Sequence, residues 1–309
     1  MTILVFGSLN MDLVVQSPRL PQPGETLTGS HFASISGGKG ANQAVAAARQ
    51  GVPVTMTGRV GADNFGHQLR HALAVDGVAV DAVLVDADTH TGVAAIAVDA
   101  AGENHIVIVP GANGRVGDAD VHRLQNQFSG ARWLLLQGEI PLSAIAQAAS
   151  QAQAAGITVI FDPAPVPAGD LTSLYPTVDI LTPNQVEAAQ LVGSPVTTKE
   201  QAAAAIANLQ SRGATTVVIK LGAQGVLCGT AGEIFHQPAF AVPVVDTVAA
   251  GDAFNGGLAV ALHDGKSLRE AVTWAAATAA LSVTQAGAQP SLPTRSQVVD
   301  CLNNAGVQY

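Results

Sequence analysis

Short runs of aliphatic and β-branched residues alternate with longer Ala-rich stretches of helical period along most of the chain. The strand-like runs cover residues 3–7, 54–57, 133–137, 158–162, 179–182 and 217–221. The helical stretches cover residues 41–50, 64–75, 142–155, 199–212, 253–263 and 268–284. This alternation predicts an α/β fold of three layers, in which helices cover both faces of a parallel sheet. Ligands of such folds bind at the carboxyl ends of the strands.

Two segments depart from this alternation. Residues 12–36 carry several Pro and Gly residues and have no helical period, and residues 91–110 contain two strand-like runs around a hairpin signal at 99–102. We expect segments at about 13–36 and 91–110 to form a small second sheet that projects from a single domain of residues 1–309. Such a sheet could cover a site as a lid. An ordinary surface hairpin is the alternative.

Composition narrows the possible partners. The 309 residues are 48% hydrophobic and 12% charged, which is typical of a globular chain with a large core. The net charge is −9 without a basic cluster, which argues against nucleic acid or an anionic membrane as a partner. The two cysteines have no metal-ligand spacing, and no basic region precedes the first strand-like run. We therefore expect a cytoplasmic enzyme or binding protein.

Residues 246–257 contain the most informative motif. Small residues precede Asp252, and a helical pattern follows it. At such a junction main-chain N–H groups can approach an anion, and the helix dipole favours negative charge there. A carboxylate beside this anion site is suited to phosphoryl transfer, because it can accept the proton of the attacking hydroxyl. A capping Asp in a Gly-rich turn is the alternative for this motif taken alone.

A second Gly-rich segment, residues 37–43, also opens a helix. Its small residues expose main-chain N–H groups, while Lys39 and Asn42 supply polar side chains. The segment is not a Walker loop, because no Ser or Thr follows Lys39 and the glycine spacing differs, and it is not a dinucleotide fingerprint, because the third Gly is missing. It predicts contact with a small ligand, although the signal is weak on its own.

Polar residues also follow several predicted strands. Asn10 and Asp12 come after the first strand and suit vicinal hydroxyls, with an Asx turn as the equal alternative. Glu139 is another acid at a strand end. Asn184 and Glu187 suit a hydrated Mg²⁺ near phosphates, with helix capping as the alternative for Asn184.

Together these segments resemble the ribokinase family of sugar kinases, also called the phosphofructokinase-B family. The resemblance runs from Gly7 to about Pro293. The second family signature spans residues 246–258. The first includes Gly37, Gly38, Gly40, Asn42, Ala44, Gly51 and Gly61.

The resemblance implies an ATP-dependent sugar kinase with Asp252 as the catalytic base, Mg²⁺ with the nucleotide and K⁺ beside an anion hole. The anion hole would consist of Ala249, Ala250 and Gly251. The sugar positions match Asn10, Asp12, Gly38, Lys39, Asn42, Glu139 and Asp252. The nucleotide positions match Asn184, Glu187, Lys220, Gly222, Gly225 and Gly251. The K⁺ positions match Asp246, Val248, Ser282, Gln285, Gly287 and Ser291, partly through backbone carbonyls.

Within the family, residues 37–44 and 287–291 resemble the ribose-specific members, whereas fructose-specific members usually lack a Lys at position 39. The resemblance therefore favours D-ribose, phosphorylated to D-ribose 5-phosphate, over D-fructose or another sugar. Lys220 stands where ribose-specific members often have Thr, and Ala276 stands where an Asn near the adenine is common. A catalytically silent sugar-binding regulator on the same fold is the alternative of another class.

The projecting strands would leave apolar edges unpaired in a monomer. For this reason we expect a homodimer in which the two second sheets pair.

Overall fold

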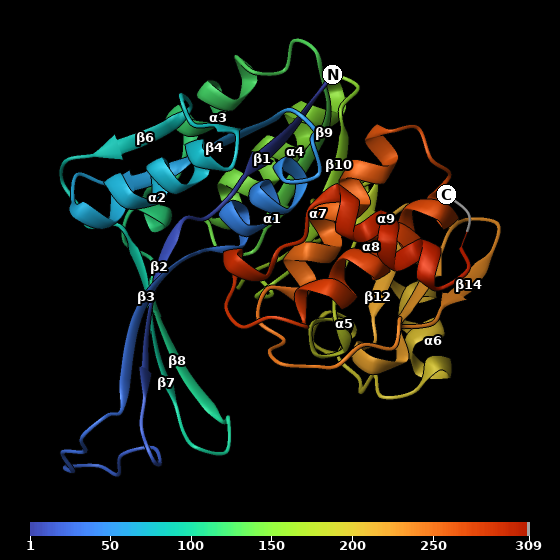
Figure 1. Cartoon of the computed structure of the whole chain (residues 1–309). Helices are drawn as coiled ribbons and strands as arrows, with labels where there is room; N and C mark the ends of the chain where they lie inside the picture. Colours follow the sequence, from blue (N-terminus) through green and yellow to red (C-terminus); the bar gives the residue numbers. More distant parts are fainter. Residues whose placement is uncertain (308–309) are drawn as a thin grey trace.

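A ten-stranded sheet forms the centre of the protein in a computed structural model that describes residues 1–307 (Figure 1). The strands follow the order β14-β13-β12-β11-β10-β9-β1-β4-β5, and β6 pairs with the far part of β4. From β12 to β5 every pairing is parallel. The strands are β1 (Thr2–Phe6), β4 (Val54–Gly61), β5 (Val78–Ala79), β6 (Val83–Asp86), β9 (Ala131–Gln137), β10 (Thr158–Asp162), β11 (Ile180–Leu181), β12 (Thr216–Lys220), β13 (Val226–Gly229) and β14 (Ile234–Gln237).

Helices cover both faces of this sheet and enclose two cores. Ile3 and Val5 of β1 point into one core, and Leu4 and Phe6 point into the other. The first core is covered by α1 (Lys39–Ala48), α2 (Asn64–Val75), α7 (Ala250–His263), α8 (Leu268–Ser282) and α9 (Arg295–Asn304). The second is covered by α3 (Asp118–Gln125), α4 (Leu142–Ala154), α5 (Gln185–Val192) and α6 (Lys199–Ser211). This is the three-layer arrangement predicted from the alternation of strands and helices.

A separate four-stranded sheet projects from the body, as Figure 1 shows. Its strand order is β3-β2-β7-β8, with β2 parallel to β7 and the outer pairs antiparallel. The strands are β2 (Asn10–Gln16), β3 (His31–Gly37), β7 (Gly92–Val98) and β8 (Asn104–Val109). The two segments that lacked helical period therefore form a small second sheet, as expected.

Short 3₁₀ helices occur at four connections. They are η1 (Gly111–Arg115), η2 (Tyr175–Thr177), η3 (Gly222–Gln224) and η4 (Gln289–Ser291). The first directly follows β8, and the third directly follows the carboxyl end of β12. These two positions place η1 at the base of the second sheet and η3 at the edge where ligands of parallel sheets bind.

The predicted α/β fold is confirmed, and the structure adds detail. The main sheet is mixed, because β13 and β14 continue it as an antiparallel pair at one edge. Helix α7 begins at Ala250, three residues earlier than its apolar period indicated, because small residues 250–252 carry no periodic signal. Helices α3, α5 and α9 were not predicted, since α3 and α9 consist mostly of polar residues and α5, with eight residues, is too short for a clear apolar period.

Within residues 1–307, none of the helices combines the length and the apolar character that a membrane span requires.

Candidate active site

Asp252 lies in the first turn of α7 and is almost completely buried. The carboxylate accepts hydrogen bonds from two side chains of α1: Asn42 Nδ2 donates to Oδ2 at 2.9 Å, and Gln43 Nε2 donates to Oδ1 at 3.2 Å. Ala249, the N-cap residue of α7, has φ 60°, a left-handed conformation that turns the chain sharply into this helix. The two Gly-rich segments of the sequence therefore meet at this carboxylate.

A hydrogen-bonded network links Asp252 to the ends of two central strands. The Nε2 group of Gln43 also donates to Oδ2 of Asp162, at the carboxyl end of β10, at 3.1 Å. Asp162 in turn forms an ion pair with Lys220, whose Nζ lies 2.9 Å from Oδ1. A Cβ atom added to Gly251 would lie 3.3 Å from Lys220 Nζ. The ammonium group is therefore next to the N-terminus of α7, where an anion would bind.

Burial and neighbouring charges set the protonation of this centre. Burial raises the pKa of Asp252 to about 6, the Lys39 ammonium opposes this rise, and the Asp162 carboxylate adds to it. Burial lowers the pKa of Lys39, but the carboxylates of Asp252 and Glu139 more than reverse this and hold it above its ordinary value. Lys39 is therefore a fixed positive charge between carboxylates.

Predicted sugar residues converge beside this centre. Glu139 Oε2 accepts from Lys39 N at 3.1 Å and from Asn10 Nδ2 at 3.4 Å, and it forms a short hydrogen bond with Ser8 Oγ at 2.5 Å. Burial, followed by the charges of Glu139 and Asp252, raises the pKa of Asp12 to about 7, and Lys39 lowers it. The structure thus brings the β1–β2 connection, the start of α1 and the segment after β9 together around the Glu139 carboxylate.

Gly38 is required for this convergence. It has φ 89°, and an added Cβ would lie 2.6 Å from Asn10 N. Only a residue without a side chain permits this approach of α1 to the start of β2. A ligand at Asn10 can therefore also reach the main chain of the Gly-rich segment.

The predicted nucleotide residues lie at the ends of β11 and β12. Asn184 caps α5, which was the alternative role considered for it from the sequence. Its Oδ1 accepts from Glu187 N at 2.9 Å, and its Nδ2 donates to Glu187 Oε1 at 2.8 Å. Burial raises the pKa of Glu187, while the Lys220 charge lowers it. An added Cβ on Gly222 would meet nothing within 4 Å, so a ligand can approach η3 closely.

The predicted cation residues lie in the loop before α7 and between the end of α8 and η4, and the carboxylate of Asp246 links these two segments. Asp246 Oδ1 accepts from Val248 N at 3.0 Å, and Oδ2 accepts from Gly287 N at 2.9 Å. Val245 and Asp246 donate through their N–H groups to Val283 O, directly after Ser282. Gln285 and Ser291 line a small polar pocket of about 110 Å³ at the same end of α8. Asp246 thus ties the loop before α7 to the segment after α8, and the K⁺ assignment of these residues stays a prediction.

The comparisons with known proteins agree with this geometry. Residues 2–295 match the pfkB family of carbohydrate kinases. The chain is 40% identical to a ribokinase of Haemophilus influenzae over 306 residues, which are 98% of this chain and 99% of that protein. The chain belongs to the pfkB family of carbohydrate kinases. The family resemblance expected from the sequence is therefore confirmed.

Solved structures of pfkB-family relatives share the fold. A structure of ribokinase from Thermotoga maritima has a TM-score of 0.88 and 36% identity, and it covers 98% of this chain and 100% of that one. A structure of Arabidopsis thaliana ribokinase with ribose and ATP has a TM-score of 0.87 and 37% identity, with 97% of this chain and 98% of that one covered.

Several residues of this pfkB-family site were missed by the sequence reasoning. They are Ser8, Gln43, Gln137 and Asp162, of which Gln137 Nε2 donates to Gln43 Oε1 at 2.9 Å. Asp162 carried a usable signal, because it is an acid at the carboxyl end of a predicted strand. Gln43 is the last residue of the Gly-rich segment 37–43, but only Lys39 and Asn42 of that segment were singled out for their side chains.

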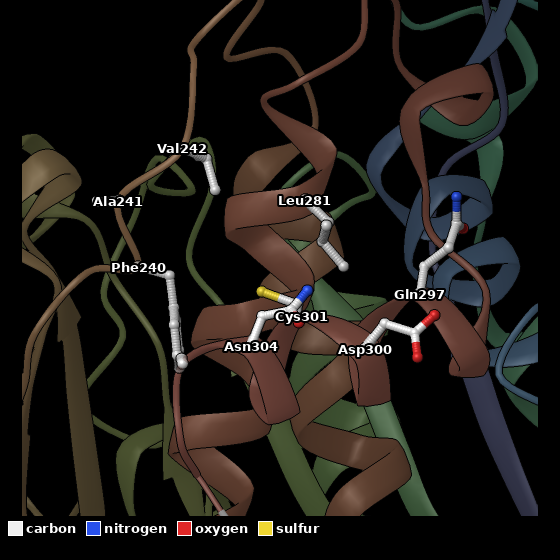
Figure 2. Close-up of a pocket in the computed structure, with 9 residues that line it drawn as sticks. Phe240, Ala241, Val242, Leu281, Gln297, Asp300, Cys301 and Asn304 are labelled. Carbon is white, nitrogen blue, oxygen red and sulfur yellow. The ribbon is translucent and has the colours of Figure 1, made fainter.

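A separate pocket of about 620 Å³ lies between the segment after β14, the end of α8 and the outer side of α9 (Figure 2). Phe240, Leu281 and Cys301 contribute to its lining. None of the predicted sugar, nucleotide or catalytic residues lines it. This pocket is therefore separate from the residues that the sequence predicts for the site.

Proposed function

We propose that this protein is an ATP-dependent ribokinase that converts D-ribose and ATP to D-ribose 5-phosphate and ADP. The buried Asp252 carboxylate at the N-terminus of α7, beside Lys220 and the backbone of Gly251, is the observation that carries this proposal. A positive N-terminus and an ammonium group suit a transferring phosphoryl group, while the carboxylate suits a hydroxyl that must lose its proton. The ribokinases among its relatives support the choice of sugar.

In this proposal the hydroxymethyl oxygen of ribose lies next to Asp252. Asp252 accepts the hydroxyl proton as the oxygen bonds to the γ-phosphorus of ATP, and the bond between that phosphorus and the β,γ-bridging oxygen breaks to release ADP. Asn42 and Gln43 hold the carboxylate in place by their hydrogen bonds. The N–H groups of Ala249, Ala250 and Gly251 would stabilise the charge that develops on the phosphoryl oxygens, and Ala250 N would have to give up its present bond to Thr247 O at 3.3 Å.

The remaining sugar hydroxyls would pair with Asn10, Asp12, Lys39 and Glu139. In the structure Asn10 and the main chain of Lys39 donate hydrogen bonds to Glu139, and the charges of Glu139 and Lys39 act on Asp12. A site of this kind discriminates against a sugar that leaves one of its buried polar groups unpaired, because that group then pays its full desolvation cost.

The nucleotide would lie across η3, with its phosphates toward Lys220, Asn184 and Glu187. Lys220 can serve as a point charge for phosphate where related enzymes have a neutral side chain. Glu187 retains lone pairs beyond those used in the helix cap and suits waters around Mg²⁺, which neutralises phosphate charge when bound. Asp246, Val248, Ser282, Gln285, Gly287 and Ser291 would hold K⁺ beside the anion site.

The second sheet would act as a lid over the sugar, because its strands β2 and β3 begin and end at Asn10 and Gly37, which border the site. Closure would keep water from replacing the sugar as acceptor. We further propose a cytoplasmic homodimer that pairs through this sheet.

A panel of sugars tests the proposal. With ATP, Mg²⁺ and K⁺, we expect kcat/KM for D-ribose to exceed that for D-fructose at least about tenfold, which corresponds to about 1.4 kcal/mol in transition-state binding. Phosphorus NMR of the product should place the phosphate on O5. A higher kcat/KM for fructose would contradict ribose as the substrate while retaining the kinase. Sugar binding without any ATP turnover would instead support the silent sugar-binding protein.

A further inference from the structure

Asn113 lies at the base of the second sheet and has no role in the site described so far. It belongs to η1, which directly follows β8, and it is 1% exposed. Its side-chain amide binds the main chain of Leu9 in both directions: Oδ1 accepts from Leu9 N at 3.0 Å, and Nδ2 donates to Leu9 O at 3.0 Å. This exchange of two hydrogen bonds resembles the pairing of facing residues in an antiparallel sheet. Asn113 therefore fixes the connection between β1 and β2.

The same amide also contacts the predicted sugar residue. Asn113 Nδ2 donates to Asn10 Oδ1 at 2.7 Å, the shortest contact that this side chain makes. Because the carbonyl oxygen of Asn10 is held by this donor, its own Nδ2 points to the other side, where Glu139 Oε2 lies at 3.4 Å. The orientation of the Asn10 amide follows from this pairing of donor and acceptor.

The main chain of β7 packs closely against this contact. Gly92, the first residue of β7, is the register partner of Asn10. A Cβ added to Gly92 would lie 2.2 Å from Asn113 Nδ2 and 2.3 Å from Asn10 Oδ1. Strands β2 and β7 of the second sheet begin, and β8 ends, close to the buried side-chain amide of Asn113.

We propose that Asn113 is a positioning residue that presents the Asn10 amide to the sugar as a hydrogen-bond donor. It also couples this orientation to the position of the second sheet relative to the main sheet. The inference rests on the proposed sugar-binding role of Asn10. Without Asn113 the Asn10 amide can rotate, and a buried carbonyl oxygen loses its partner. The sugar then meets a site that must be reordered before binding, which weakens affinity more than it slows the phosphoryl transfer at Asp252.

Steady-state kinetics of Asn113→Ala test this role. We expect KM for the sugar to rise about tenfold, kcat to change less than about threefold, and KM for ATP to stay unchanged. Asn113→Asp retains the acceptor for Leu9 N but places an acceptor against Asn10 Oδ1. It should raise the same KM at least as much, and it provides a second variant if Asn113→Ala does not fold.

A double-mutant cycle separates positioning from general stability. In an Asn10→Ala background, Asn113→Ala should raise KM for the sugar less than twofold further, because there is no Asn10 amide left to orient. Gln50→Leu is the matched control. Gln50 is also a fully buried amide, two residues beyond the C-terminal end of α1, and its Oε1 accepts from Trp274 Nε1 at 2.6 Å. This substitution should therefore lower the melting temperature without changing KM for the sugar.

The wild type is assayed first, and the variants are compared on whichever sugar it phosphorylates. If D-ribose is not a substrate, the proposed function fails while the test of Asn113 proceeds on the accepted sugar. Unchanged KM for that sugar in both Asn113 variants, equal loss of kcat and kcat/KM, or fully additive effects in the cycle would overturn the positioning role.

Discussion

At the scale of single residues, the position of Asp252 decides the chemistry. Its carboxylate is buried, bound by two amides and next to a helix N-terminus. Replacing it by Asn keeps the shape and most hydrogen-bonding capacity but removes the proton acceptor. We expect Asp252→Asn to lower kcat by about 100-fold or more, with sugar affinity nearly unchanged.

Initial rates and sugar binding by calorimetry measure this effect. Asp81→Asn, at an exposed acid, serves as the control and should keep wild-type turnover. If Asp252→Asn retains more than about a tenth of wild-type kcat, Asp252 is not the base.

The charges around Asp252 also predict how activity depends on pH. A carboxylate accepts a proton only when ionised, so kcat should fall as pH decreases through the pKa of Asp252, about 6. The Asp162 charge raises the pKa of Asp252, so Asp162→Asn should lower this pKa and shift the acidic limb of the kcat profile to lower pH. A limb that stays in place would mean that Asp162 does not act on the base.

At the scale of elements, Asp246 joins the loop before α7 to the loop after α8 through Val248 N and Gly287 N. A bound K⁺ would add a positive charge beside these loops and order the N-terminus of α7. In a buffer free of other small cations, we expect added K⁺ to raise both the activity and the melting temperature.

Asp246→Ala should lose both K⁺ responses, whereas Asp264→Ala, at the other end of α7, should keep them. Equal activity and equal melting temperature of the wild type with and without K⁺ would contradict the predicted cation site.

At the scale of the whole molecule, the second sheet exposes apolar side chains away from the main core. Ile106, Val107 and Ile108 of β8 are 51%, 64% and 44% exposed, and β8 is an edge strand. Such an edge is protected by pairing with another chain. We expect a homodimer of twice 31.2 kDa that pairs through this sheet.

Light scattering at assay concentration measures the assembly. Val107→Glu should shift it toward the monomer and raise KM for the sugar, whereas Val75→Glu, at a 73% exposed position on α2, should change neither. A fully active wild-type monomer would contradict the dimer.

The sequence by itself determined the alternation of strands and helices, the second sheet and the segments that meet at Asp252. These features follow from local periodicity and from small residues at loop-to-helix junctions, which depend only on neighbours along the chain. For the same reason Asn10, Lys39 and Glu139 could be singled out in advance: Asn10 and Glu139 follow β1 and β9 closely along the chain, and Lys39 opens α1.

Only the tertiary structure decided which distant side chains pair. Gln43 reaches Asp162, 119 residues away, and Asn113 reaches Leu9, 104 residues away. Such contacts depend on the order of strands in the sheet and on close backbone approaches, which no local pattern encodes. The antiparallel edge of β13 and β14 has the same origin, because the direction of a short strand is set by its connection and its neighbours rather than by its own residues.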